Sequence, residues 1–308
     1  MKIAGSLCVL AAVALLGCGG STAAPLLDSY QPATVETEAQ AKTWASVSAP
    51  MVYVQASMPL ASIGLATQLP ADASSSFDPD CPKRTQSGNT LTVEGGCTDK
   101  NGVKWFGKAV QNSEAAGSTT GRFTYQDFGM ERSETCQGNT VTSKATFNGV
   151  LDVSGTQQET RFDVDTKAEG TDLDESTCAV KTLSAAWDYQ GTIQRDGNAT
   201  TWNGSGRMGS SELGVVSAET KDEVLNPSTC ANEASSGTTT IKAGSNIVVI
   251  TYDGATKCDD NSTAKWSLNG ADKGELTGVA CSAASGPATV GASLMVLAAL
   301  ALVRRRFR

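Results

Sequence analysis

Pairs of Asn-Gly or Asp-Gly residues recur along the chain, and they constrain its fold more than any other feature. Both residues of such a pair tolerate the positive φ angles that two-residue β-hairpin turns require. The pairs are Asn101-Gly102, Asn148-Gly149, Asp196-Gly197, Asp253-Gly254 and Asn269-Gly270. Short β-favouring stretches lie around them, at 91–96, 103–110, 122–128, 140–147, 150–155, 160–166, 184–193, 212–220, 238–243, 246–252, 264–268 and 275–280. Many short strands separated by turns predict an antiparallel all-β architecture.

The expected fold is therefore mainly β, an antiparallel meander that forms a sandwich or an open, barrel-like sheet. Its abundant Thr, Ser and Gly residues predict a polar, solvated outer face. In the stretch RFTYQDF, strict alternation places Phe123, Tyr125 and Asp127 on one face and Phe128 on the other.

The segment 34–70 differs from the rest because it is rich in alanine and poor in turn signals. Apolar side chains recur there at helical spacing, at Val47, Met51, Val54, Met58, Ala61 and Leu65. Pro50 and Pro59 would interrupt a single helix. We expect a broken helix over 34–70 that packs against the sheet, followed by a disulfide-containing β domain over 71–280.

Six cysteines lie inside this β domain, and an even number in an exported chain indicates disulfides. Spacing alone leaves every pairing open, and we favour the sequential one because each pair brackets a hairpin or strand pair. The predicted bridges are Cys81–Cys97, Cys136–Cys178 and Cys230–Cys258. A structural zinc site is not expected, since the chain has no histidine and no Cys-x-x-Cys motif.

The charge and the missing histidine narrow the functional classes. Residues 19–280 carry 19 basic and 32 acidic side chains, a net charge of −13. Such a field repels nucleic acid, so no nucleic-acid partner is expected. Without histidine, the Ser-His and Cys-His nucleophile pairs are excluded. No cofactor is expected.

The first 18 residues have the form of an export signal. Lys2 precedes an apolar run over 7–16 that is too short to span a bilayer. The residues LLGC that end at Cys18 resemble a bacterial lipobox. That resemblance implies cleavage after Gly17 and a lipid on Cys18, with 19–33 as a linker. The alternative is an ordinary signal peptide that contains a cysteine.

The last 28 residues, 281–308, combine a cysteine, a small polar spacer, an apolar stretch and an arginine cluster. This order resembles the myxobacterial C-terminal sorting tail known as MYXO-CTERM. The resemblance implies that Cys281 is the processing and anchoring residue and that the following segment is removed. The apolar run over 290–303 barely matches a bilayer core of ~30 Å. The alternative is a permanent transmembrane helix held by the arginines.

Few side chains in the middle of the chain point to specific chemistry. Asp163, Asp165, Asp172, Asp174 and Glu175 form an acidic cluster that lacks the spacing of an EF-hand calcium loop. Trp105, Trp187, Trp202 and Trp266 lie in strand-like contexts, where packing in the core is the usual role of tryptophan. No catalytic residue is predicted.

The expected protein is exported to the outer membrane or cell surface and tethered there, with a structural or binding role. Its expected partners are the export and sorting machinery, the membrane and an extracellular ligand of unknown class. One alternative is a histidine-free hydrolase that uses paired carboxylates, which would lie ~5–10 Å apart across a groove. Another is a carbohydrate-binding module, which would expose two or more tryptophans on one face.

Overall fold

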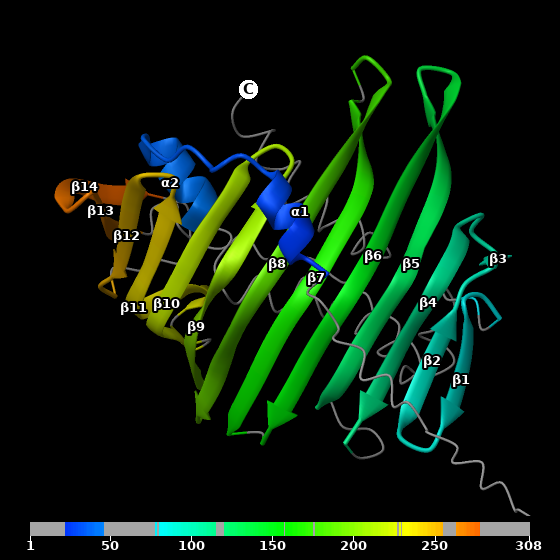
Figure 1. Cartoon of the computed structure of the whole chain (residues 1–308), viewed down its shortest axis with the longest axis horizontal. Coiled ribbons are helices and arrows are strands. Elements are labelled where there is room, and N and C mark those ends of the chain that lie inside the picture. Colours follow the sequence, from blue (N-terminus) through cyan, green and yellow to red (C-terminus); the bar gives the residue numbers. More distant parts are fainter. Residues whose placement is uncertain are drawn as a thin grey trace, which may run out of the picture.

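The computed structural model describes residues 22–45, 78, 80–114, 120–156, 158–174, 176–226, 228, 230–254 and 263–277. The predicted signal, the C-terminal tail and most of the predicted broken helix lie outside these ranges. Within them, fourteen strands form a single antiparallel sheet, which confirms the predicted fold class (Figure 1).

The strands follow one another across the sheet nearly in chain order. The order is β1-β2-β4-β5-β6-β7-β8-β9-β10-β11-β12-β13-β14, and β3 pairs with β4. β1 and β14 are therefore the two edges of the described sheet. The first strands are β1 (Lys83–Ser87), β2 (Thr90–Glu94), β3 (Cys97–Thr98), β4 (Lys104–Ser113) and β5 (Gly121–Cys136). The central strands are β6 (Asn139–Gly155), β7 (Glu159–Asp174), β8 (Ala179–Asp196), β9 (Ala199–Ser210) and β10 (Gly214–Asn226). The last strands are β11 (Cys230–Ala243), β12 (Asn246–Tyr252), β13 (Thr263–Leu268) and β14 (Ala271–Thr277).

Two short helices precede the sheet: α1 (Ala24–Ser29) and α2 (Glu38–Ala45). α2 lies in the part of the chain where a helix was predicted. α1 falls inside 19–33, where a linker was predicted, so that interval is partly folded. The predicted helical positions from Val47 to Leu65 lie outside the described residues.

The central strands are much longer than the short stretches that the sequence suggested. The predicted strands 140–147 and 150–155 are one strand, β6, and the Asn148-Gly149 pair between them makes no turn. Asn101-Gly102 and Asn269-Gly270 do lie at the expected turns, and Asp196-Gly197 meets one, because Asp196 ends β8 and Gly197 begins the turn. In the last of these, φ is 52° at Asn269 and 79° at Gly270, as the turn chemistry requires.

Asn148 and Gly149 instead support a β-bulge in the neighbouring strand. The pairing of β5 with β6 shifts between Tyr125 and Phe128, where Asp127 adopts a φ of 46°. The Asp127 amide donates to Asn148 Oδ1 at 2.8 Å. The inserted residue turns Phe128 to the same side as Tyr125, so the predicted alternation in RFTYQDF was wrong at this point.

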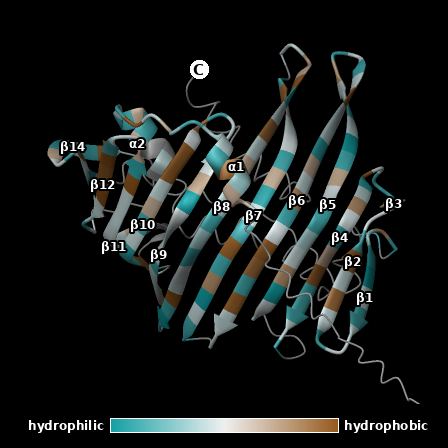
Figure 2. Ribbon diagram, viewed as in Figure 1, coloured by the Kyte–Doolittle hydropathy of each residue, from teal (hydrophilic) through white to brown (hydrophobic). Residues whose placement is uncertain are grey.

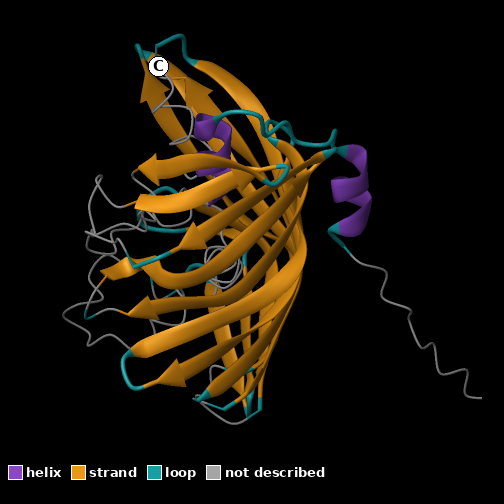
Figure 3. Ribbon diagram, turned by 90° about the vertical axis from the view of Figure 1, so that its left-hand side faces the viewer, coloured by secondary structure: helices purple, strands orange, loops and turns teal. Residues whose placement is uncertain are grey.

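A second bulge repeats the same construction in the other half of the sheet. Pairing shifts between Thr220 and Glu223 of β10, and Asp222 there adopts a φ of 50°. The Asp222 amide donates to Asn203 Oδ1 at 2.9 Å. Bulges increase local twist and bend the strand that carries them. Both therefore fit the marked curvature of the sheet (Figure 3).

The apolar core lies on the concave face of this curved sheet. Along the central strands, hydrophobic and hydrophilic residues alternate, as Figure 2 shows. Fully buried side chains from strands far apart in sequence belong to one cluster, for example Leu151, Val164, Ile193, Ile241 and Leu276. Removing apolar surface from water stabilises a fold by about 25 cal/mol per Å². Burial on this face is therefore the main stabilising contribution.

Two of the three predicted disulfides are confirmed. Cys81 bonds to Cys97, and Cys136 bonds to Cys178. Cys258 and the side chain of Cys230 lie outside the described part of the chain, so the third bridge stays a prediction.

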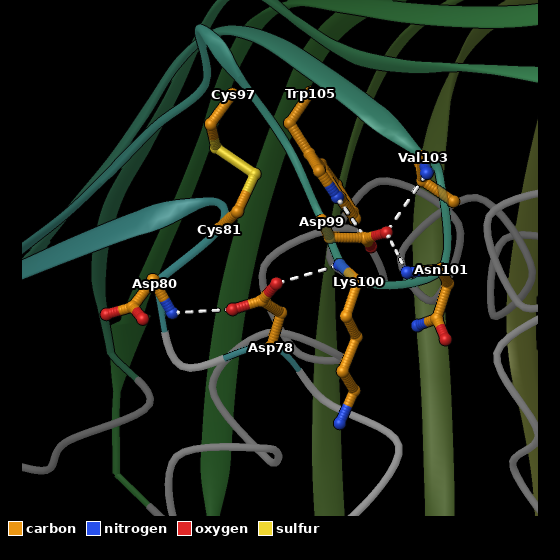
Figure 4. Close-up of a disulfide and its surroundings, with 9 residues drawn as sticks. All are labelled: Asp78, Asp80, Cys81, Cys97, Asp99, Lys100, Asn101, Val103 and Trp105. Atoms are coloured by element: carbon orange, nitrogen blue, oxygen red, sulfur yellow. Dashed lines mark hydrogen bonds between the residues drawn. A yellow bond between two sulfur atoms is a disulfide. The ribbon is translucent and has the colours of Figure 1, made fainter.

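The Cys81–Cys97 bridge lies at a corner that two carboxylates hold together (Figure 4). Asp99 accepts hydrogen bonds from the amides of Asn101 and Val103 and from the Trp105 indole, at 2.8, 3.0 and 3.2 Å. Asp78 accepts from the amides of Asp80 and Lys100, which lowers the pKa of its carboxyl group. These carboxylates order the loops beside β1 and β4.

The Cys136–Cys178 bridge joins two hairpins that project beyond the rest of the sheet, β5–β6 and β7–β8 (Figure 1). The pairing of β6 with β7 ends at Ala145 and Gly170. Beyond that point β5 still pairs with β6 and β7 with β8, so the two hairpins extend separately. The Gln137 side-chain amide donates to the Ser176 carbonyl at 2.8 Å, so the two tips also meet through a hydrogen bond.

The first bulge predicts a difference between two glycines that both have positive φ angles. A Cβ at Gly107, where φ is 68°, would overlap the Asp127 carbonyl oxygen. At Gly138, where φ is 82°, nothing lies within 4 Å of a Cβ. We expect Gly107→Ala to lower the free energy of unfolding by more than about 3 kcal/mol, and Gly138→Ala by about 1 kcal/mol. Urea denaturation measures both, and equal losses would show that the bulge is not crowded.

Candidate functional site at the N-terminal clip

Residues 22–45 pass from one face of the sheet to the other, and we call this segment the N-terminal clip. Figure 3 shows its two helices on opposite sides of the sheet, joined over the rim. At the rim, Pro32 forms a parallel bridge with Val215 of β10. The Ala33 amide donates to the Val215 carbonyl at 3.0 Å, and the Val215 amide donates to the Gln31 carbonyl at 2.9 Å.

One carboxylate holds the beginning of the clip. Asp165 of β7 accepts hydrogen bonds from the backbone amides of Thr22 and Ala23, both at 2.7 Å. The N-cap residue of α1 is Ala23, which has no side chain that could cap the helix. The first amides of a helix have no partner within the helix and favour negative charge. Asp165 thus supplies the acceptor that α1 itself lacks.

Apolar packing and two side-chain contacts fix α1 to the convex face. Ala23 and Leu27 are buried against Ala186 of β8. Arg207 of β9 pairs with Asp28 at 2.7 Å, and this hydrogen bond raises the pKa of the guanidinium group. The Tyr30 hydroxyl donates to Ser184 Oγ at 2.8 Å.

The second half of the clip belongs to the concave face. Ala33, Val35, Ala41 and Trp44 are buried in the main core cluster. A capping box begins α2, because Gln40 Oε1 accepts from the Thr37 amide at 3.1 Å while the Gln40 amide donates to Thr37 Oγ1 at 3.3 Å. The clip therefore contributes packed side chains to both faces of one sheet.

A cleft of about 490 Å³ lies between the clip and the β9–β10 turn. Its lining includes Tyr30, Gln40, Ser211 and Glu212. The polar groups of these residues bind other parts of the protein: Ser211 Oγ accepts from the Ser184 amide, and Glu212 pairs with Lys181. The cleft is thus part of the clip's attachment to the sheet.

A buried carboxylate, which the sequence did not single out, lies on the concave face. Glu223 is 2% exposed and follows the second bulge. Burial raises the pKa of its carboxyl group to about 7, although hydrogen bonds from the hydroxyls of Thr239 and Tyr252 partly oppose this shift. The Tyr189 hydroxyl, also buried, donates to Thr220 Oγ1 at 3.3 Å nearby. Glu223 could not be recognised from the sequence, because only the bulge between Thr220 and Glu223 turns its side chain towards the concave face.

The acidic cluster considered for calcium is divided in the structure. Asp163 and Asp165 lie on the convex face of β7, and Asp165 binds the clip. Asp174 accepts from the Ser176 amide and hydroxyl in the β7–β8 turn, and its pKa falls to about 2. Glu175 and the side chain of Asp172 lie outside the described residues. Among the described residues, no three His, Cys, Asp or Glu side chains come together as a metal site.

Carboxylates do face one another on neighbouring strands, but on the convex face. Asp152 is opposite Asp163, and Asp165 is opposite Asp188. Burial raises the pKa of Asp163, and the charges of the nearby aspartates raise it further. These pairs lie on an outward-curving sheet, whereas the hydrolase alternative requires carboxylates across a groove.

The tryptophans lie in the core rather than on an open surface. Trp187, Trp202 and Trp266 are 6–7% exposed, and Trp105 is half-buried against the same cluster. Their burial agrees with the packing role and does not provide the exposed tryptophans of a carbohydrate-binding surface.

The two predicted attachment cysteines lie outside the described residues. Cys18 is four residues before Thr22, and Cys281 is four residues after Thr277, where β14 ends. Within the described ranges, no helix is long and apolar enough to cross a membrane. In comparisons with known proteins, no family model, curated protein or solved structure matches the chain.

Glu223 predicts a pH dependence of stability. Its folded pKa of about 7 exceeds the ordinary value of 4.5, so the folded state binds the proton more tightly than the unfolded state. The free energy of unfolding should therefore fall as pH rises from about 4.5 to about 7, by on the order of 3 kcal/mol from this group. Glu223→Gln should remove that loss and make the protein more stable than wild type at pH 8.

Urea denaturation at pH 5 and pH 8 measures this effect. Glu275→Gln is the matched control, because Glu275 is exposed on β14. An unchanged pH dependence in Glu223→Gln would contradict the assignment.

Proposed function

We propose that the chain is an exported protein tethered to the outer membrane or cell surface through a lipid on Cys18, with a structural or binding role there. The observation that carries this proposal is the capture of the Thr22 and Ala23 amides by Asp165. This contact holds Thr22, which is four residues after Cys18, against the sheet, so a lipid on Cys18 would lie close to the body of the protein.

The same contacts favour cleavage after Gly17 over cleavage by an ordinary signal peptidase further along. Ser21-Thr22-Ala23 has the small-residue pattern that such an enzyme accepts. Cleavage after Ala23 would remove both residues whose amides bind Asp165. Cleavage after Gly17 keeps the whole clip and leaves Cys18 as the first residue.

The disulfides agree with export. Cys81–Cys97 and Cys136–Cys178 are bonds that form and persist mainly in oxidising compartments. They support a location outside the cytoplasm without specifying which surface.

A second attachment, at Cys281, is proposed from the C-terminal resemblance. β14 ends at Thr277, so processing at Cys281 would leave every described strand intact. In this proposal the apolar stretch and the arginines hold the chain in the membrane until the sorting machinery removes them.

Mass spectrometry of the protein recovered from cells tests both attachments. We expect an N-terminal peptide that begins at lipid-modified Cys18, and a mature chain without Arg308. Cys18→Ser should lose the lipid and leave the C-terminal processing unchanged. Cys281→Ser should keep the lipid on Cys18 and retain Arg308.

Two results would contradict the proposal at separate points. An unmodified N-terminus beyond Thr22 would exclude lipidation at Cys18. An intact Arg308 on the mature protein would exclude processing and indicate a permanent anchor.

A further inference from the structure

We propose that the convex face of the sheet, with α1 on it, lies against the lipid bilayer in the tethered protein. This inference rests on the proposed lipid at Cys18 and adds the orientation that the clip would impose. It identifies the convex face as an interaction surface and lipid headgroups as its partner.

The position of Thr22 provides the first argument. Its amide is bound to Asp165 in the middle of β7, which has several strands on either side of it in the sheet. Four residues of fully extended chain span at most about 14 Å. A lipid on Cys18 therefore enters the bilayer close to the centre of the convex face, far from either edge strand. A flat bilayer within that reach meets the convex face and α1 first.

The charges on this face provide the second argument. Its basic side chains pair with acidic partners on neighbouring strands, but Asp152, Asp163, Asp165 and Asp188 also lie close together at its centre. Ion pairs on it are Lys108–Glu94, Arg122–Asp152, Arg207–Asp28, Arg207–Asp188, Lys221–Glu219 and Lys265–Asp253, with N–O distances of 2.7–3.5 Å. Opposite charges at such spacing cancel within a Debye length of about 8–10 Å. The ion pairs therefore weaken the field of most of this face, and the aspartates around Asp165 favour headgroups without net negative charge, such as phosphatidylcholine.

The attachment at Cys281 would impose a different orientation. Thr277 ends β14, an edge strand, so a lipid bound there would bring that edge to the membrane. The two attachments are therefore distinguishable by which part of the sheet approaches the bilayer.

Fluorescence quenching in vesicles tests the proposal. Three variants each carry one fluorescent label: Lys167→Cys on the convex face, Lys273→Cys on β14, and Thr142→Cys on the projecting β5–β6 hairpin. Lys167 is opposite Ala186, which α1 covers, whereas Lys273 and Thr142 are exposed. The lipid-modified protein is inserted into phosphatidylcholine vesicles that contain a lipid with a quencher on its headgroup.

We expect a severalfold greater loss of fluorescence at position 167 than at 142 or 273, and the same order in a Cys281→Ser background. The strongest quenching at 273 would overturn the proposal in favour of an edge-on orientation, and equal quenching at all three would show no fixed orientation. Circular dichroism confirms folding of each variant, and Glu169→Cys replaces Lys167→Cys if that variant misfolds.

The mass of the N-terminal peptide is measured on the same samples. If the protein carries the lipid but position 167 is not quenched most strongly, the proposed orientation is wrong while the attachment at Cys18 stands. Protein without lipid disproves the attachment on which it rests.

Discussion

The arrangement of this protein around its N-terminus depends on one carboxylate that binds two backbone amides. Asp165 accepts hydrogen bonds from the amides of Thr22 and Ala23 and so fixes the beginning of the clip to the convex face of β7. From that point the chain forms α1, crosses the rim beside Val215 and enters the concave core at Ala33. Charge-assisted hydrogen bonds of this kind contribute about 1.5–3 kcal/mol each. The contact therefore decides where an attachment at Cys18 would meet the sheet.

The curvature of the sheet follows from residues that interrupt regular pairing. Asp127 and Asp222 adopt positive φ angles at equivalent bulges. In each bulge the aspartate's amide donates a hydrogen bond to the side-chain oxygen of an asparagine on the neighbouring strand. Gly107 and Gly237 lie opposite these bulges, where a Cβ would overlap the backbone. The bent sheet gathers its aromatic and aliphatic side chains on the inside and leaves a mixed, ion-paired surface outside.

Local sequence signals predicted the type of fold and three turns, because each of these depends on nearby residues. The two disulfides followed from pairing the cysteines in sequence order, although Cys136 and Cys178 are 42 residues apart. Asn269-Gly270 makes its turn through its own backbone preferences. Asn148-Gly149 carries the same signal but supports a bulge, since its partner Asp127 is 21 residues away in the sequence. The clip could not be predicted for the same reason: Asp165 and Thr22 are 143 residues apart. Pro25 in the first turn of α1 and the pair Thr37 and Gln40 were local signals that could have revealed the two helices.

Amide hydrogen exchange at Thr22 and Ala23 tests the central claim most directly. The structure predicts slow exchange at both amides in the folded protein and a large acceleration in Asp165→Ala. Asp163→Ala should leave both rates unchanged, because Asp163 lies on the same face of the same strand and accepts from neither amide. Fast exchange at both amides in the wild-type protein would show that the clip is not docked, and the attachment and orientation proposed from it would lose their structural basis.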